Sequence, residues 1–269
     1  DAWSDMIALK KVPTGDVTHG LVRYNWTANT TYDEYQHDVG SVGNNSTATS
    51  ASNVYDSRFY VMTEDYNVYK CIRTGRSSGG AVVASTVAPS GTSSTAIIET
   101  ADTGAGTGRG YKWKYMYSLT AAQQANFLST DFMAVATNST VAAAAVDGAV
   151  NVVKIKTAGS GGSNGSHTGV AIRGDGSSGV ATVTVSGGAV TAVTVTTPGT
   201  GYTFAYIRSE DIIAATNAGG AGSGCNLNVI IPPKGGHGKD AVKELGGFYV
   251  MMNKSLVGVE GTSDIGVGN

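Results

Sequence analysis

A gapless internal duplication sets the strongest constraint on what this chain can fold into. Residues 147–161 (DGAVNVVKIKTAGSG) align with residues 187–201 (GGAVTAVTVTTPGTG) at a constant offset of 40 residues. Each copy has a turn, an alternating strand and a Gly-x-Gly loop, and each is followed later by a Gly-rich turn and a further strand, at 180–185 and 225–231. The pattern predicts a duplicated β module. Two units are too few for a solenoid, so we expect a small sandwich or barrel-like body.

The duplication lies inside a block of distinct composition. From about 140 to 231 the chain is mostly Gly, Ser, Thr, Ala and Val, whereas the flanks hold most of the large apolar side chains. We therefore predict a mixed α/β core domain made of residues 1–140 and 231–269, with an inserted β module at 141–230. The expected fold class is α+β, predominantly β, with few short helices. The insert is expected to fold on its own, to face outward and to be removable.

Alternating apolar patterns in the first flank predict individual strands. Residues 58–62 and 68–72 are β-favouring runs joined by a polar turn, which indicates a hairpin. Residues 111–117 alternate aromatic side chains with Lys112 and Lys114, which predicts a strand with four rings on one buried face and both lysines on the other. This segment could also be a stacking platform for bases or sugars, but lysines on the opposite face favour a buried core strand.

Two short helices and one further strand are predicted from end signals. Thr120 followed by Gln123 forms a capping-box pattern, so a helix should begin near Thr120. Residues 240–245 are followed by paired glycines, which predicts a second short helix stopped by glycine. Residues 248–252 then form a strand rich in large apolar side chains, and we expect it to rejoin the first domain.

The bulk properties argue against several classes of function. The chain has 18 Lys and Arg against 20 Asp and Glu, a net charge of -2, so nothing draws it to polyanions and no nucleic-acid partner is expected. Cys71 and Cys225 are too few and too far apart for a disulfide framework or a thiolate zinc site, and we interpret them as buried free thiols. No window reaches the roughly 18 to 20 apolar residues of a membrane-spanning helix, so no membrane partner is expected.

Two Gly-rich segments resemble phosphate-binding loops but lack required residues. Residues 234–240 (KGGHGKD) precede a predicted helix, yet Pro233 stands where a Walker loop needs Gly, and Asp240 stands where it needs Ser or Thr. Residues 104–110 run into a strand, whereas a dinucleotide fingerprint must open a helix. Both are interpreted as structural turns. No nucleotide is expected to bind, and Lys239→Ala should leave stability nearly unchanged.

No set of residues stands out as catalytic or metal-binding. Residues 33–38 (DEYQHD) group three carboxylates around one histidine, but with no second His nearby we interpret them as a solvated polar segment. His19 and His167 stand alone, without a Gly-x-Ser-x-Gly or Cys–His motif. We therefore assign no catalytic, cofactor-binding or metal residue, expect no cofactor and interpret the protein as a non-enzyme. A nucleophile and base brought together only by folding remain open.

Three motifs in order carry a family resemblance. Residues 23–26 (RYNW), 66–71 (YNVYKC) and 110–115 (GYKWKY) resemble, in order and separation, the dimer-forming baseplate wedge subunit of T4-like contractile-tail bacteriophages. Residues 1–12, with Trp3 and Met6, look like the stretch upstream of the first motif in that family.

The resemblance covers part of the chain. It extends over residues 1–128 and, more weakly, 246–252, and the family usually has residues before this start and after this end. The Gly-rich insert departs from it and looks like β modules that decorate tail proteins of phages infecting cyanobacteria. The resemblance implies a structural homodimer in the virion tail baseplate, made in the host cytoplasm, with other baseplate wedge proteins as partners and no small-molecule substrate. We expect the dimer contact on the domain at residues 1–128.

Two alternative functions stay open. One is a host-receptor or carbohydrate-binding module of a tail fibre or spike, whose contact surface would be exposed aromatic residues of the insert: Tyr202, Phe204 and Tyr206. The other is a glycan hydrolase, which needs two carboxylates at a matched separation. The acids well inside the insert are Asp175, Glu210 and Asp211, and nothing in the sequence pairs them.

Overall fold

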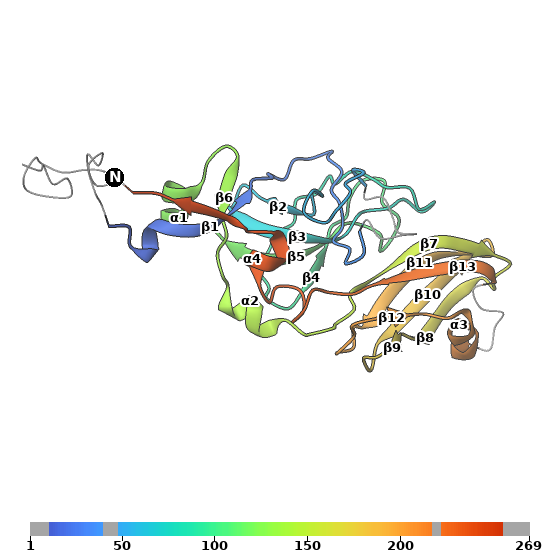
Figure 1. Ribbon diagram of the computed structural model, residues 1–269. Coiled ribbons are helices and arrows are strands. Elements are labelled where there is room, and N and C mark those ends of the chain that lie inside the picture. Colours follow the sequence, from blue (N-terminus) through green and yellow to red (C-terminus); the bar gives the residue numbers. More distant parts are fainter. Residues whose placement is uncertain (1–10, 40–47, 217–221, 255–269) are drawn as a thin grey trace, which may run out of the picture.

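The computed structural model describes residues 11–39, 48–216 and 222–254. Strands account for 37% of the chain and helices for 11%, in several antiparallel sheets, which confirms the predicted α+β, predominantly β class. Figure 1 shows two neighbouring bodies and a ribbon that projects from one of them. The core body is built from both flanks of the chain. The insert is built from β7 to β13, at residues 152–230. The projecting ribbon is formed by two strands of the core body, β1 and β14, and we call it the arm.

The core body contains most of the helices. Its elements in chain order are η1 (Thr14–Asp16), β1 (Val17–Val22), β2 (Tyr60–Met62), β3 (Asn67–Arg73), β4 (Ile97–Glu99), β5 (Lys112–Ser118), α1 (Ala121–Phe127), β6 (Phe132–Ala134), α2 (Ser139–Ala144), α4 (Ala241–Leu245) and β14 (Tyr249–Met252). The predicted hairpin is β2–β3, and the predicted capping box opens α1, where Thr120 and Gln123 bond reciprocally. Gly246 ends α4 in the left-handed conformation, as the sequence indicates.

The described residues of the insert form seven strands and one helix. They are β7 (Val152–Ser160), β8 (Gly165–Ala171), β9 (Arg173–Gly174), β10 (Val180–Ser186), β11 (Ala189–Thr197), β12 (Ala205–Tyr206), α3 (Ser209–Thr216) and β13 (Ser223–Ile230). The described strands of the insert pair only with one another, in the orders β11-β10-β8, β13-β7 and β12-β9.

The sheet β2-β3-β5-β4 of the core body is covered on both faces. One face carries a cluster that includes Tyr69 and Trp113, and the other carries a cluster that includes Ile72 and Met116. The prediction of a single buried face for β5 is therefore wrong. Lys114 lies opposite the rings, as expected, but it is buried and donates a hydrogen bond to the carbonyl of Ser94.

A bulge in β5 changes the face of one aromatic residue. Tyr115 and Tyr117 pair with adjacent residues of β3, Tyr69 and Val68, so Met116 between them is the extra residue of the bulge. Tyr111, Trp113 and Tyr115 pack in one cluster, whereas Tyr117 packs in the other, with its hydroxyl donating to the carbonyl of Ala134. The four predicted rings are buried, but they do not share one face.

The two copies of the duplication interlock. The opening strand of the first copy, β7, pairs with the late strand β13, while the opening strand of the second copy, β11, pairs with β10, which precedes it. Each opening strand thus pairs with the later strand of the other copy. Neither copy forms a closed unit by itself.

The duplication is visible in the backbone of the insert. Val153 and Ile155 pair with Val229 and Leu227, and the residues 40 positions later make the matching pairs in β10–β11: Val193 with Val183 and Val195 with Ala181. Both ladders have an irregularity after that second pair. Matched glycines share positive φ angles between 64° and 77°, which only glycine adopts readily: Gly148 and Gly188, Gly159 and Gly199, Gly161 and Gly201.

The sheets of the insert meet along β7 and β11. Backbone hydrogen bonds link the two strands near both ends, from Val150 to Pro198 at 3.0 Å and from Gly162 to Gly188 at 2.8 Å. Apolar side chains from both sheets fill the interior, and the described strands do not close into a barrel. Helix α3 lies against β8 and supplies Ile212 to this interior.

The base of the insert packs against the apolar cluster of the core body through one pair of strand partners. Val152 and Ile230 are Cα partners at the base of β7–β13, and both pack into the core body's apolar cluster. Helix α2 crosses the predicted limit at 140–141, and its Val141 packs in the cluster of Trp113. The structure therefore places α2 with the core body.

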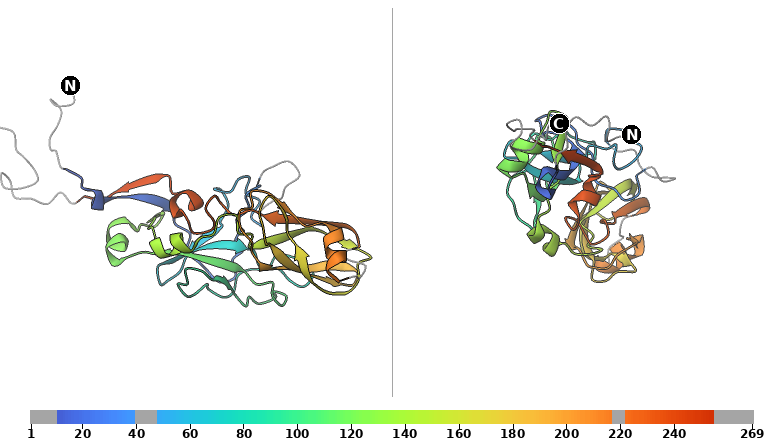
Figure 2. Two further views of the ribbon diagram at one scale, coloured as in Figure 1. Left: turned by 90° about the horizontal axis from the view of Figure 1, so that it is seen from below. Right: turned by 60° about the vertical axis from the view of Figure 1, so that its left-hand side comes forward.

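The predicted C-terminal strand rejoins the N-terminal segment. β14 pairs with β1, and β1 pairs with β6, in an antiparallel sheet of order β14-β1-β6. Figures 1 and 2 show β1 and β14 running away from the core body on the side opposite the insert. The arm is thus the part of the described fold farthest from the β module.

Candidate functional site

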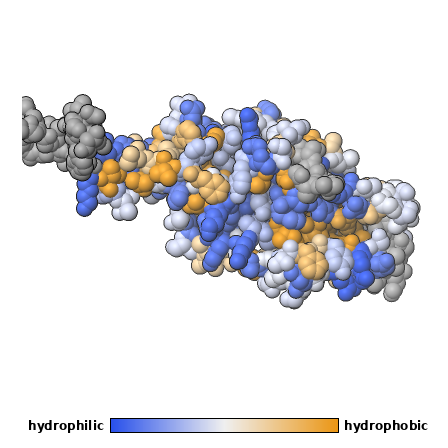
Figure 3. Space-filling model, viewed as in Figure 1, coloured by the Kyte–Doolittle hydropathy of each residue, from blue (hydrophilic) through white to orange (hydrophobic). Residues whose placement is uncertain are grey.

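The arm carries a strip of exposed apolar side chains. Phe248, directly before β14, and Val250 and Met252 within it are 65%, 72% and 66% exposed, and their alternation places them on one face. On the neighbouring strand Val17, the Cα partner of Met252, is also exposed. The space-filling view in Figure 3 shows apolar surface gathered along this projecting part. We call these four residues the arm strip.

The opposite face of β14 is partly covered: Met251 is half-buried, and Tyr249 is 52% exposed but contacts a neighbouring strand. Met251 lies over Gly20, where an added Cβ would come within 2.6 Å of its side chain, so this glycine permits the close approach. The ring of Tyr249 meets that of Phe132 edge-on at 5.1 Å. Because these contacts fix β14, the outward residues are presented as an ordered apolar surface rather than a loose tail.

The arm strip lies on a sheet edge. Among the described strands, β14 has β1 on one side and no partner on the other. An edge strand exposes backbone N–H and C=O groups that can pair with another chain, and proteins usually protect such edges with charges or proline. No charged residue or proline lies between 248 and 252. An exposed, apolar, uncharged edge is suited to pairing with another protein chain.

The Gly-rich segment 234–240 folds around a carboxylate of the chain itself. Glu244 accepts hydrogen bonds from the backbone N–H groups of Gly238 and Asp240, at 2.8 to 3.1 Å. It also forms an ion pair with Lys70, whose Nζ lies 2.8 Å away, and both side chains are almost fully buried. The amides that a phosphate would need are thus occupied by Glu244. Lys239 lies outside this cluster, with its Nζ 3.5 Å from the carbonyl of Ala142.

His237 is buried next to the Lys70–Glu244 pair. Burial, and secondly the positive charges of Lys70 and Lys114, hold the pKa of His237 well below its usual range. Burial also lowers the pKa of Lys70, although Glu244 opposes the shift. The ring of Tyr35 lies 4.0 Å from the Lys70 ammonium and edge-on to His237. The cluster joins β3, α4 and the loop before α4, which makes it a structural lock of the core body.

Residues 33–38 connect the core body to the insert. Glu34 forms an ion pair with Lys154 at 3.2 Å, and Asp38 accepts a hydrogen bond from Asn228 at 3.0 Å. His37 accepts from the amide of Ile231 at 3.1 Å, and burial lowers its pKa. Asp33, Glu34 and Gln36 are buried, so the prediction of a solvated polar segment is wrong. Glu34 and Gln36 use their charge and hydrogen-bonding capacity at the junction, on Lys154, whereas Asp33 accepts hydrogen bonds within the core body.

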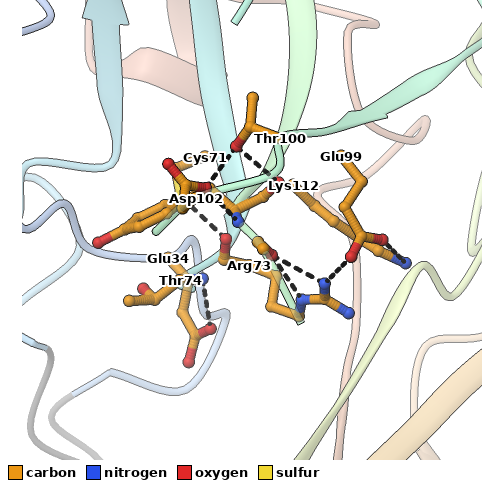
Figure 4. A network of polar contacts seen from close by, with 10 residues as sticks. Glu34, Cys71, Arg73, Thr74, Glu99, Thr100, Asp102 and Lys112 are labelled. Carbon is orange, nitrogen blue, oxygen red and sulfur yellow. Dashed lines mark hydrogen bonds and ion pairs between the residues drawn. The ribbon is translucent and has the colours of Figure 1, made fainter. Parts of the chain in front are cut away.

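A second polar network borders the same junction. Figure 4 shows the Arg73 guanidinium directed toward Glu99, at 2.9 Å, and Lys112 on the other side of that carboxylate, at 3.9 Å. Asp102 accepts hydrogen bonds from Thr100 and from several backbone amides of the neighbouring loops. Burial alone would raise the pKa of Asp102, but these hydrogen bonds outweigh it and lower the pKa. These hydrogen bonds of Asp102 hold the segments on either side of residues 104–110, which form a turn, as expected.

Asp175 and Asp211 of the insert are already engaged, whereas Glu210 is exposed and lies 3.6 Å from Arg208. Asp211 accepts hydrogen bonds from Arg173 and Arg208, and those from Arg173 contribute most to lowering the pKa of its carboxyl to about 2. Asp175 accepts from the Thr203 hydroxyl and from the amides of Thr203 and Phe204, which also lowers its pKa to about 2. A general acid needs a carboxyl that stays protonated near neutral pH, so neither residue is suited to that role.

The aromatic residues of the insert divide into buried and exposed. Tyr202 is 2% exposed and its hydroxyl donates to the carbonyl of Ile172, so its predicted exposure is wrong. Phe204 and Tyr206 are 56% and 45% exposed at the β12 segment. Two of the three aromatic side chains are therefore available for contacts.

Comparisons with known proteins leave the fold and its surfaces to be interpreted on their own. No family model, no curated protein and no solved structure matches this chain. Within residues 11–39, 48–216 and 222–254, no group of three or more His, Cys, Asp or Glu side chains is arranged to hold a metal ion. In the same ranges no helix has the length and apolar character to cross a membrane.

Proposed function

We propose that this protein is a structural subunit of a phage tail baseplate that scaffolds wedge assembly through protein–protein contacts and acts as a homodimer. The resemblance of residues 1–128 to the wedge subunit suggests the class, and one observation supports it: the arm strip on the free edge of β14. A particle subunit works through such surfaces, and the proposal requires no catalytic set or cofactor.

The proposed partner of the arm is a second copy of the same chain. A two-fold axis beside β14 would pair two β14 strands edge to edge and bring both strips together, because a closed two-fold contact uses one surface twice. The strip's uncharged sequence does not oppose this approach. The strip combines β14 from the C-terminal flank with Val17 of β1, which lies in the segment 1–128 where the contact was expected.

The free energy of burying the strip is of the same order as the cost of association. Fully burying a large apolar side chain contributes about 1.5–3 kcal/mol, so covering the partly exposed strip contributes on the order of 1–2 kcal/mol per side chain. Eight side chains in a symmetric pair would supply roughly 8–16 kcal/mol, which is comparable to the association cost of about 4–15 kcal/mol. Backbone hydrogen bonds between the two edges would then favour the dimer.

The oligomeric state tests the proposed contact. Light scattering on the purified protein at tens of micromolar should give the mass of a dimer. Val250→Lys places a charge in the middle of the strip and should give a monomer, whereas Val87→Lys, at an exposed loop position, should remain dimeric. A monomeric parent protein, or a Val250→Lys dimer, would overturn the proposed contact.

The assignment to the particle is tested separately. Immunogold electron microscopy of phage particles that contain the protein should place the label at the baseplate. Label on the fibres or on the capsid would refute the baseplate assignment while leaving the dimer result intact.

A second candidate function rests on the exposed aromatics of β12. Phe204 and Tyr206 could stack on sugar rings in a host-receptor or carbohydrate-binding module. Binding to a glycan array that is lost in Phe204→Ala, with the dimer preserved, would favour this alternative.

A further inference from the structure

A cavity of about 360 Å³ lies between the core body and the insert. Its wall on the core side includes Arg73, Arg76 and Arg109, and its wall on the insert side includes Lys154 of β7 and the first residues of β11. The volume falls within the range of small-molecule sites, about 300–1,000 Å³. The cavity thus exists only because the two bodies are packed together.

The charges around this cavity are unbalanced. Glu34, which lines it, pairs with Lys154 at 3.2 Å and with Arg76 at 3.7 Å, so one carboxylate serves two cations. Glu99 likewise serves both Arg73 and Lys112. The whole chain carries a net charge of -2, whereas the lining of the cavity carries more cations than carboxylates, so the positive charge is a local feature of the cavity.

Arg109 has no carboxylate partner among the described residues. Its guanidinium donates to the carbonyl oxygens of Ser77 and Ser78, at 2.9 and 3.3 Å. Partial burial, and then the proximity of Arg73 and Arg76, lower its pKa, so neighbouring cations act on it without a compensating anion. Arg73 and Arg76 each share a carboxylate with another cation, and Arg109 has none, so an added anion would interact favourably with all three guanidinium groups.

We propose that this cavity binds an oxyanion, a phosphate or carboxylate group carried by a small molecule, with Arg76 and Arg109 as the principal contacts. A guanidinium matches the geometry of both groups and can bind them with two parallel hydrogen bonds. The ligand would join loops of the core body to β7 of the insert, and so strengthen the packing of the two bodies. This site is separate from the arm strip and does not depend on the proposed function.

Calorimetric titration of the full chain tests the site with two probes, inorganic phosphate and glucuronate, at constant moderate salt. We expect saturable binding of at least one probe. Arg109→Gln should weaken it at least tenfold. The matched control is Arg23→Gln, because Arg23 also donates to a backbone carbonyl, that of Ser129, but does not line the cavity. Binding by phosphate alone or by glucuronate alone supports the site and identifies the group.

A second variant distinguishes ligand binding from structural damage. Glu34→Gln removes the carboxylate that neutralises Arg76 and Lys154, so it should tighten anion binding severalfold even if it destabilises the junction. If Glu34→Gln acted only by loosening the cavity, it would weaken anion binding instead. The proposal is overturned if neither probe shows saturable binding up to about 10 mM, or if Arg109→Gln and Arg23→Gln bind equally well.

Discussion

Replacing Glu244 by Gln should destabilise the protein more than any surface substitution. Lys70 is fully buried, and Glu244 supplies its ion pair, so the variant leaves a buried ammonium without a counter-charge. Removing one partner of a buried ion pair costs about 3–5 kcal/mol. The backbone N–H groups of Gly238 and Asp240 now donate to the two carboxylate oxygens of Glu244. Gln has only one oxygen to accept them, and its NH2 group would face N–H donors. The expected loss lies at the upper part of that range.

Urea unfolding followed by fluorescence measures this loss. With a urea dependence of about 2–3 kcal/mol per molar, the midpoint should fall by roughly 1–2 M. Lys243→Met, which breaks the exposed pair with Asp240, is the control and should change the free energy of unfolding by less than about 1 kcal/mol. The double variant Lys70→Met with Glu244→Gln should lose less than the sum of the two single variants, because the two side chains interact. A loss for Glu244→Gln no larger than that of Lys243→Met would refute the proposed lock.

Three further outcomes are expected. Burial lowers the pKa of His237 in the folded protein, while the unfolded chain protonates it below about pH 6.5, so stability should fall on acidification from pH 6.5 to 5, by at most about 1.5 kcal/mol. His237→Gln should lack this part of the pH dependence, as unfolding curves at both pH values would show. A chain in which a Gly-containing turn replaces residues 153–229 should fold, as measured by circular dichroism and thermal melting, because the cut ends, Val152 and Ile230, are strand partners. Deletion of 141–230 should give a markedly less stable protein, because it also removes Val141, Val152 and Ile230 from the core. Lys239→Ala should change the unfolding free energy by less than about 0.5 kcal/mol, and neither it nor the parent should bind ATP at micromolar concentration in calorimetry.

Local features were predictable from the sequence because their determinants lie close together in the chain. The capping box at Thr120, the left-handed stop at Gly246 and the glycine turn between β10 and β11 all follow from residues within a few positions. The duplication likewise predicted where the strands of the insert lie. It did not predict that they interlock, because the pairing of β7 with β13 is set by packing between distant segments.

The junction was missed because polarity does not reveal burial. Residues 33–38 have the composition of a solvated loop, and only the fold brings Lys154 and Asn228 to their carboxylates. The same limit explains Tyr202, which was expected among the exposed aromatics of the insert but is buried and donates a hydrogen bond to the carbonyl of Ile172. Residues 248–252 were predicted as a strand, yet the exposed face of that strand depends on which side Met251 packs.

The interlocked pairing of the insert has a consequence for the order of events during synthesis. The β10–β11 hairpin can close as soon as it leaves the ribosome, because its strands are neighbours in the chain. β7 must instead wait until β13 has been made, since Val152 pairs with Ile230, 78 residues later. Until then the nascent chain exposes an apolar strand edge, and closure of so long a loop is slow. A stall or a premature stop before residue 223 would therefore leave an incomplete insert that invites pairing with other chains.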